Sequence, residues 1–177
     1  MTRADARRSV ESIIEAARDA LSEDPAASAE AIIARSGVHR ATFYRHFSSR
    51  EALALAIYDR YVERVAEIVR QADAVAAPDE ALERIARGII AQTRRDRVFL
   101  YVAPRGRRED NRHLFDAVRR HVDAAREQGL IRSDESADSL HRAYYALVIG
   151  LGLTPGCDDA AESARLVMSL LRGRPDR

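Results

Sequence analysis

Apolar residues recur at helical spacing along nearly the whole chain, and they predict an all-α protein. The first such segment covers roughly residues 5–22 and ends in the polar run SEDPAAS. Apolar positions three and four apart fall on one face of a helix, so we expect this segment to bury a single stripe against a core. The stripe consists of Val10, Ile13, Ile14, Ala17 and Leu21.

Two short helices are expected next, joined by a glycine turn. Ser28 precedes the first of them and is suited to cap it, and the two neighbouring isoleucines are its expected buried positions. The run Ser36-Gly37-Val38 then interrupts the pattern, because Gly37 is free to take the positive φ that closes a tight turn. The second helix is expected over roughly residues 39–46.

A long helix follows this pair. The run Ser48-Ser49-Arg50-Glu51 has the pattern of a capping box, in which Ser48 bonds the amide of Glu51 and Glu51 reaches back to Ser48. Its apolar positions carry the helix to about residue 74, and they are Leu53, Ile57, Tyr61, Val65, Ile68 and Val69.

Beyond Pro78 the helical pattern continues to the end of the chain. Further helices are expected over roughly residues 82–90, 114–125, 135–151 and 158–172. The apolar run VFLYVA at 98–103 is ambiguous, because Val, Phe and Tyr favour strands. Since no second strand candidate exists to pair with it, we predict a helix there as well.

Composition changes this picture only slightly. The 177 residues carry 29 basic side chains, all of them Arg, and 28 acids, so any basic surface must be local. A single cysteine, Cys157, excludes an internal disulfide and a Cys-based zinc site, and it fits a reducing compartment. The chain has neither a signal-peptide pattern nor the 18 or so unbroken apolar residues of a membrane span, so a cytoplasmic protein without a membrane partner is expected.

Charge is unevenly spread at one place. From Ala31 to Arg50 the chain has four arginines and no Asp or Glu. This acid-free stretch covers the glycine turn and the whole second short helix. A helix pair of this kind is suited to docking into the major groove of double-stranded DNA, with its flanks on phosphates and its tip on the bases.

The helical wheel of residues 39–46 divides the second helix into two faces. Phe43 and Phe47 fall one turn apart and are expected to pack into the core, while Ala41 and Arg45 point away from it. Hydroxyl and guanidinium groups suit phosphate oxygens, which set the register of a protein on DNA. The residues expected to hold phosphates are Thr42, Tyr44, Arg45 and Arg50.

The first turn of this helix is expected to read sequence. Arg40 can reach two acceptors on a guanine edge, and His39 can donate to one. Ala41 allows a close approach of the backbone and contact with a thymine methyl group.

The run AEAIIARSGVHRATFYRHFSSREALALAIYDR resembles the DNA-binding signature of the TetR family of transcriptional repressors. The resemblance covers roughly residues 10–57. It rests on Gly37-Val38, Thr42, Tyr44, Phe47 and Ser49-Arg50-Glu51. His39 and Ala41 depart from the family pattern, where Ser and Gly are frequent. Both lie in the turn that reads bases, so the operator sequence does not follow from the resemblance.

The resemblance implies an organisation for the whole chain. Residues 1–50 would form a helix-turn-helix DNA-binding domain, a connecting helix would cover about 49–74, and residues 79–177 would form a helical regulatory and dimerisation domain. Members of the family pair as homodimers through their last two long helices, and this fits the palindromic sites that twofold pairs recognise. The residues expected at the dimer interface are Leu147, Gly150, Leu151, Ala164, Val167, Met168 and Leu171.

The family resemblance also implies a small-molecule effector held in a helical cavity. The residues that combine aromatic walls with polar groups, as ligand sites do, are Phe99, Tyr101, Phe115, His121, Tyr144 and Tyr145. They equally fit an ordinary helical core. The arginines that crowd residues 94–112 are compatible with an acidic effector or with a solvated loop, and they are Arg94, Arg95, Arg97, Arg105, Arg107, Arg108 and Arg112.

The function expected is therefore a repressor that binds a palindromic operator and is released by an effector. A ligand-independent DNA-binding dimer, whose C-terminal half only dimerises, remains the alternative. An enzyme is not expected, because no phosphate loop or nucleophile elbow occurs. His113, His121 and His141 lack zinc-ligand spacing, so neither a cofactor nor a metal is predicted, although a His-carboxylate metal site stays open.

Overall fold

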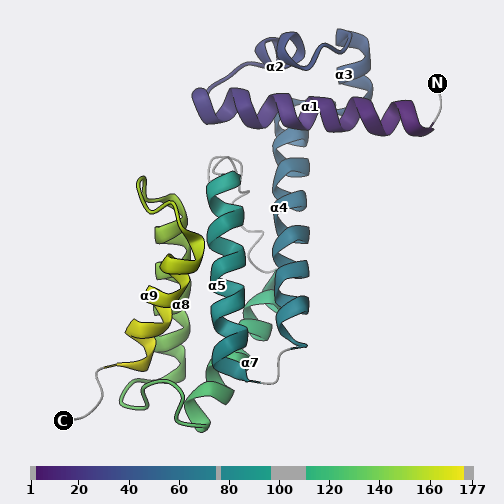
Figure 1. The fold of residues 1–177 in the computed structure, drawn as a ribbon. Helices are drawn as coiled ribbons and strands as arrows, with labels where there is room; N and C mark the ends of the chain where they lie inside the picture. Colours follow the sequence, from purple (N-terminus) through teal and green to yellow (C-terminus); the bar gives the residue numbers. More distant parts are fainter. Residues whose placement is uncertain (1–2, 75–76, 97–110, 174–177) are drawn as a thin grey trace. The chain divides into compact units, whose positions relative to one another are not determined.

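The computed structural model describes residues 3–74, 77–96 and 111–173, and every regular element in these ranges is an α-helix (Figure 1). The all-α prediction is confirmed for this part of the chain. The helices are α1 (Arg3–Glu23), α2 (Ala29–Ser36), α3 (Arg40–His46), α4 (Arg50–Ala72), α5 (Pro78–Arg95), α7 (Arg112–Glu127), α8 (Ala137–Leu153) and α9 (Ala160–Arg172). The run VFLYVA, predicted as a helix, lies outside the described residues.

The described residues form two compact units, and the division falls inside α4, between Tyr61 and Val62. The first unit holds α1, α2, α3 and the first half of α4, together with Asp96. Asp96 is almost wholly buried and forms an ion pair with Arg18 of α1, at 3.0 Å between Oδ1 and Nε. The second unit holds residues 62–72 of α4 and the helices α5, α7, α8 and α9.

The core of the first unit is built from the stripes that the periodicity predicts. Every helix of the unit contributes to it, and the fully buried members include Ile13, Ala17, Ile32, Phe43, Leu53 and Ile57. Burying one such side chain contributes about 1.5–3 kcal/mol relative to leaving it exposed. Because α2 and α3 are too short to be stable alone, this shared core is what holds them as helices.

In the second unit α5 is the central helix, and α7, α8 and α9 all pack against it (Figure 1). Its buried face includes Leu82, Ile85, Ile89 and Ile90. The backbone of α8 comes unusually close to α5 at Gly152, where an added Cβ would lie 2.7 Å from the side chain of Thr93. Only glycine permits that approach.

The predicted capping box of the long helix is wrong by one residue. Ser49, not Ser48, is the cap: its hydroxyl accepts a hydrogen bond from the amide of Ala52 at 3.1 Å. The amide of Phe47 still donates to the carbonyl oxygen of Phe43 at the end of α3, and Ser48 lies in the turn between α3 and α4. Glu51 still takes part, since hydrogen bonds from its own amide and from the Ser49 hydroxyl lower the pKa of its carboxyl group.

The turn between α2 and α3 has the predicted geometry. Gly37 ends α2 with a φ of 68°, in the left-handed region. A Cβ added there would have nothing within 4 Å, so the requirement for glycine comes from the backbone and not from crowding.

Replacing Gly37 with Val should therefore destabilise the first unit by about 1–2 kcal/mol, because a β-branched residue resists positive φ. Gly37→Asn is the matched control and should cost less, since Asn visits the left-handed region more readily. Thermal and urea unfolding of the two variants measure the difference. Equal and unchanged melting of both variants would contradict the turn described here.

Candidate DNA-binding surface

Hydrogen bonds at both ends of α2 fix the helix pair. At its start the Ser28 side chain accepts from the amide of Ala31 at 3.2 Å, as the sequence predicts. At its end the Ser12 hydroxyl of α1 donates to the carbonyl oxygen of Ser36 at 2.8 Å. The second bond was not foreseen, since it joins residues far apart in the chain. Together they set where the glycine turn, and hence α3, begins.

Two aromatic side chains fix the rotation of α3 about its axis. Phe43 is fully buried and Phe47 almost so, and their rings lie 6.1 Å apart between centroids. With these two residues in the core, Ala41, Tyr44 and Arg45 are exposed on the opposite side, and Thr42 is half-buried between the two faces. The wheel prediction of a core face and an outward face is confirmed.

His39 stands at the N-cap of α3, but its imidazole does not cap the helix. Its carbonyl oxygen accepts from the amides of Thr42 and Phe43, at 2.8 and 3.0 Å, while its ring makes no capping hydrogen bond and is exposed. The backbone therefore performs the structural role at this position. The ring is left on the outer surface at the tip of the helix, where a base-reading group has to be.

Arg40 is held by two neighbours, and neither contact is predictable from its position in the sequence. Its Nη1 atom lies 3.1 Å from Oε1 of Glu30, in the first turn of α2. Its guanidinium carbon also lies 5.3 Å from the centroid of the Tyr44 ring, which is cation–π range. Glu30 is the residue just before the acid-free stretch. Counting acids within that stretch therefore did not reveal the pair.

Arg50 is used inside the protein in a way that was not predicted. Its Nε donates to the carbonyl oxygen of Ala27 at 3.1 Å, and its Nη2 donates to that of Pro25. The guanidinium thus fastens the loop between α1 and α2 to the start of α4. A contact between Arg50 and phosphate stays a prediction. The guanidinium group already donates two of its N–H groups to carbonyl oxygens of the protein.

Outside the predicted contact set, Arg35 of α2 is also paired. Its Nη2 lies 2.7 Å from Oε2 of Glu23, at the end of α1. The hydrogen bond between them lowers the pKa of Glu23 and raises the pKa of Arg35. Two of the four arginines in the acid-free stretch, Arg35 and Arg40, therefore meet carboxylates that precede it in the sequence.

The predicted ligand residues do not form a single cluster. Phe115 and Tyr145 do meet, with ring centroids 4.7 Å apart, and His141 joins them at 5.2 Å from Tyr145. Tyr144 is instead fully buried and donates from its hydroxyl to the carbonyl oxygen of Leu82 at 2.8 Å. Three further expected residues are placed otherwise: His121 bonds Asp73 at 2.9 Å, and Phe99 and Tyr101 lie outside the described residues.

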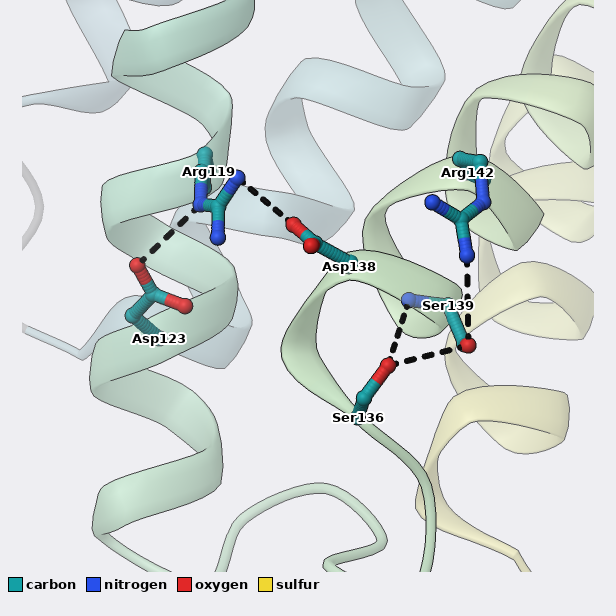
Figure 2. A network of polar contacts seen from close by, with 6 residues as sticks. All are labelled: Arg119, Asp123, Ser136, Asp138, Ser139 and Arg142. Carbon is teal, nitrogen blue, oxygen red and sulfur yellow. Dashed lines mark hydrogen bonds and ion pairs between the residues drawn. The ribbon is translucent and has the colours of Figure 1, made fainter.

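A polar network positions the start of α8 beside α7 (Figure 2). Arg119 of α7 forms an ion pair with Asp138 at 2.6 Å and lies 3.8 Å from Asp123 on its own helix. The Ser136 hydroxyl caps α8 by accepting from the amide of Ser139 at 3.1 Å. The Ser139 hydroxyl in turn contacts both Ser136 and Arg142. The network holds the first turn of α8 in place, and His141 and Tyr145 follow on that helix.

Four of the predicted dimer-interface residues are in the core of the protomer. The structure buries Ala164, Val167, Met168 and Leu171 within the second unit, so they have no surface to offer a partner. This part of the prediction is wrong, because α9 carries apolar residues on more than one face. The exposed apolar residues of α9 are Leu166 and Leu170, at 49% and 50% exposure. On α8, Leu147 and Leu151 are half-buried and Gly150 is exposed.

Two other kinds of feature are absent from the residues that the structure describes. They contain no group of three or more His, Cys, Asp or Glu side chains that could hold a metal ion. In the same ranges, no helix is long and apolar enough to cross a membrane.

His141 should give the second unit a pH-dependent stability. Its Nε2 atom is buried without a hydrogen bond, and burial, followed by the charge of Arg119, lowers its pKa from the ordinary 6.5 despite Asp123, Asp138 and Asp116. The unfolded chain therefore binds this proton at higher pH than the folded chain, so folding stability should fall as pH falls from about 7 through the lowered pKa.

Replacing His141 with Gln should make the free energy of unfolding fall less steeply as the pH is lowered from about 7 through the lowered pKa of His141. Urea unfolding at several pH values measures the slope. His113→Gln is the control, since His113 is exposed on the same pair of helices. Parallel slopes for His141→Gln and the unmodified protein would show that this imidazole is not the source.

Comparisons with known proteins agree with this geometry. Residues 13–57 match the model of bacterial regulatory proteins of the tetR family. No curated protein has a significantly similar sequence. Among solved structures, the chain is similar to the TetR family regulator PfmR from Thermus thermophilus, with 21% identity, a TM-score of 0.78, and coverage of 94% of this chain and 96% of that one.

Two further structures extend the likeness. A TetR transcriptional regulator from Streptomyces coelicolor is 29% identical, with a TM-score of 0.61 and coverage of 92% and 98%. The TetR-like regulator LfrR from Mycobacterium smegmatis, solved in complex with proflavine, is 18% identical, with a TM-score of 0.70 and coverage of 97% and 98%. The helix-turn-helix region thus matches the tetR family of regulators, and the fold of the chain is that of TetR-family transcriptional regulators.

Proposed function

We propose that this protein is a transcriptional repressor that binds a palindromic DNA operator as a homodimer and is released by a small-molecule effector. The observation that carries the proposal is the outward face of α3. With Phe43 and Phe47 in the core, α3 presents Ala41, Tyr44 and Arg45 to solvent, and no carboxylate occurs in the sequence from residue 31 to residue 50.

The side chains of this face are suited to two kinds of contact with DNA, one with phosphates and one with bases. Tyr44 and Arg45 can donate to phosphate oxygens, which fixes register and supplies most of the salt-dependent affinity. His39 and Arg40 lie at the tip of the helix, the part that enters the major groove in helix-turn-helix proteins. Base contacts from these two would set the preferred sequence.

Replacing Arg45 with Ala should weaken binding to preferred and random DNA alike and reduce the slope of log affinity against log salt by about 1. The preferred DNA is first selected by the unmodified protein from a pool of random duplexes, and affinities are then measured by fluorescence anisotropy. Arg87→Ala removes the same charge from an exposed position on α5 and is the matched control. If both variants bind alike, α3 is not the docking face.

Replacing His39 with Ala should instead change which sequence is selected, because one lost base contact costs about 1–3 kcal/mol of discrimination. An unchanged preference would remove His39 from the base contacts.

For the homodimer we propose a face on α8 and α9 centred on Leu166 and Leu170. These leucines are one helical turn apart, so they lie on the same side of α9. Exposed large apolar side chains that adjoin each other mark association surfaces more often than isolated ones do. Leu147, Gly150 and Leu151 of α8 keep their predicted place in this face.

The charge substitution Leu166→Glu should convert the dimer to monomers, because a carboxylate in an apolar interface is left without a partner. Sedimentation velocity measures the mass. Gln128→Glu adds the same charge at the exposed end of α7 and should leave the dimer intact. A monomeric unmodified protein, or a dimer that tolerates Leu166→Glu, would overturn the proposed face.

Effector control is supported by the aromatic cluster of Phe115, His141 and Tyr145 and by the regulator LfrR, which was solved with proflavine. The bonded Tyr144 hydroxyl and the His121–Asp73 pair, however, leave two of the predicted ligand residues occupied within the protein. That observation favours the alternative of a ligand-independent dimer.

Footprinting on the DNA upstream of the protein's own gene, with and without candidate ligands, distinguishes a repressor released by an effector from a ligand-independent dimer. Loss of a palindromic footprint on adding a ligand supports effector release. A footprint that no ligand removes supports the alternative, and the absence of any footprint argues against regulation at that site.

A further inference from the structure

Arg40, at the tip of α3, forms an ion pair with a carboxylate on the face that is proposed to meet DNA. Glu30 approaches its Nη1 to 3.1 Å from α2, while the Tyr44 ring lies under its guanidinium at 5.3 Å. Glu30 comes from the helix before the turn, and Tyr44 from one turn further along α3. The guanidinium is therefore held from two different directions, by a charge and by a ring.

Stability alone is a weak reason for this ion pair. The side chains of Arg40 and Glu30 are 65% and 59% exposed, and ion pairs this exposed contribute little to folding. A carboxylate in the first turn of α2 is favourable to the helix dipole, which accounts for an acid there but not for its contact with Arg40. On a surface that meets phosphates, the same carboxylate repels the ligand. Its place beside Arg40 therefore calls for a role in binding.

The geometry of a guanidinium group suggests that role. Arg has five N–H donors in a flat fork, and the bond to Glu30 uses only one edge of it. Contact with both Glu30 and the Tyr44 ring restricts the guanidinium, so we expect the remaining donors to favour one direction, as a bidentate contact with guanine O6 and N7 requires. The paired carboxylate also offsets the attraction of Arg40 to phosphates at large.

We propose that Glu30 is a positioning residue that sets the specificity of the DNA-binding surface by directing Arg40 to a base edge and keeping it from the phosphate backbone. This inference rests on the proposed function, because it needs α3 to bind DNA. It assigns a role in the choice of DNA sequence to Glu30, a residue of α2 and not of α3.

The test compares Glu30→Gln with Glu23→Gln. Both variants remove one carboxylate from the first unit, and both break an exposed ion pair with an arginine of the acid-free stretch, Arg40 in one case and Arg35 in the other. The unmodified protein first selects its preferred sequence from random duplexes. Affinity for that sequence, for its single-base variants and for random DNA is then measured over a range of salt concentrations.

Glu30→Gln should raise affinity for random DNA, steepen its salt dependence, and lower the ratio of preferred to random affinity by about tenfold, within the range carried by one bidentate base contact. Glu23→Gln should change both affinities by the same factor and leave the ratio unaltered. When Arg40 is already replaced by Ala, adding Glu30→Gln should have no further effect on the ratio, because there is no fork left to direct.

Equal ratios for Glu30→Gln and Glu23→Gln would overturn the inference, since only net charge would then matter. So would an effect of Glu30→Gln that persists without Arg40, which would mean that Glu30 itself contacts a base such as cytosine. If the unmodified protein selected no sequence at all, the result would instead contradict the proposed function of sequence-specific DNA binding. Thermal melting of each variant checks that the first unit stays folded.

Discussion

The burial of Phe43 determines the rest of the proposed DNA-binding surface. Helix α3 has only seven residues and no side-chain cap, so little in its own sequence makes it stable. With Phe43 at zero exposure and Phe47 one turn later, the helix is fixed both in position and in rotation. The outward direction of Tyr44 and Arg45 is a consequence, because neighbours on a helix differ by about 100°. The side chains that this face presents are therefore set by the core packing behind it.

Features that depend on residues near each other in the chain were predictable. Helical periodicity predicted the core stripes of α1 and α4, and Gly37 predicted the turn, because the left-handed region is open to glycine and resisted by most residues. The core and outward faces of α3 followed from the spacing of Phe43 and Phe47. These are short-range relations, and the sequence carries them directly.

Features that depend on distant partners were not predictable. Arg50 looked like a phosphate ligand, yet it donates to two carbonyl groups more than twenty positions earlier in the chain. Glu30 was treated as lying outside the basic stretch, although the turn folds it back onto Arg40. On α9 the apolar residues occupy more than one face, so periodicity could not say that Val167 faces the core and Leu166 the solvent. In each case the deciding contact is three-dimensional.

The close approach at Gly152 has a mechanical consequence for the second unit. The backbone of α8 rests against the Thr93 side chain, where even one added methyl group would overlap. Sliding α8 along α5 by one turn would bring Val148 to that point, and its side chain is larger than the single methyl group that already overlaps. Lateral displacement is thereby blocked, whereas a swivel about the contact is not. Any rearrangement of this helix pair should thus behave as a hinge with its fulcrum at Gly152, close to the C-terminal end of α8, so that the N-terminal end of α8 moves farthest.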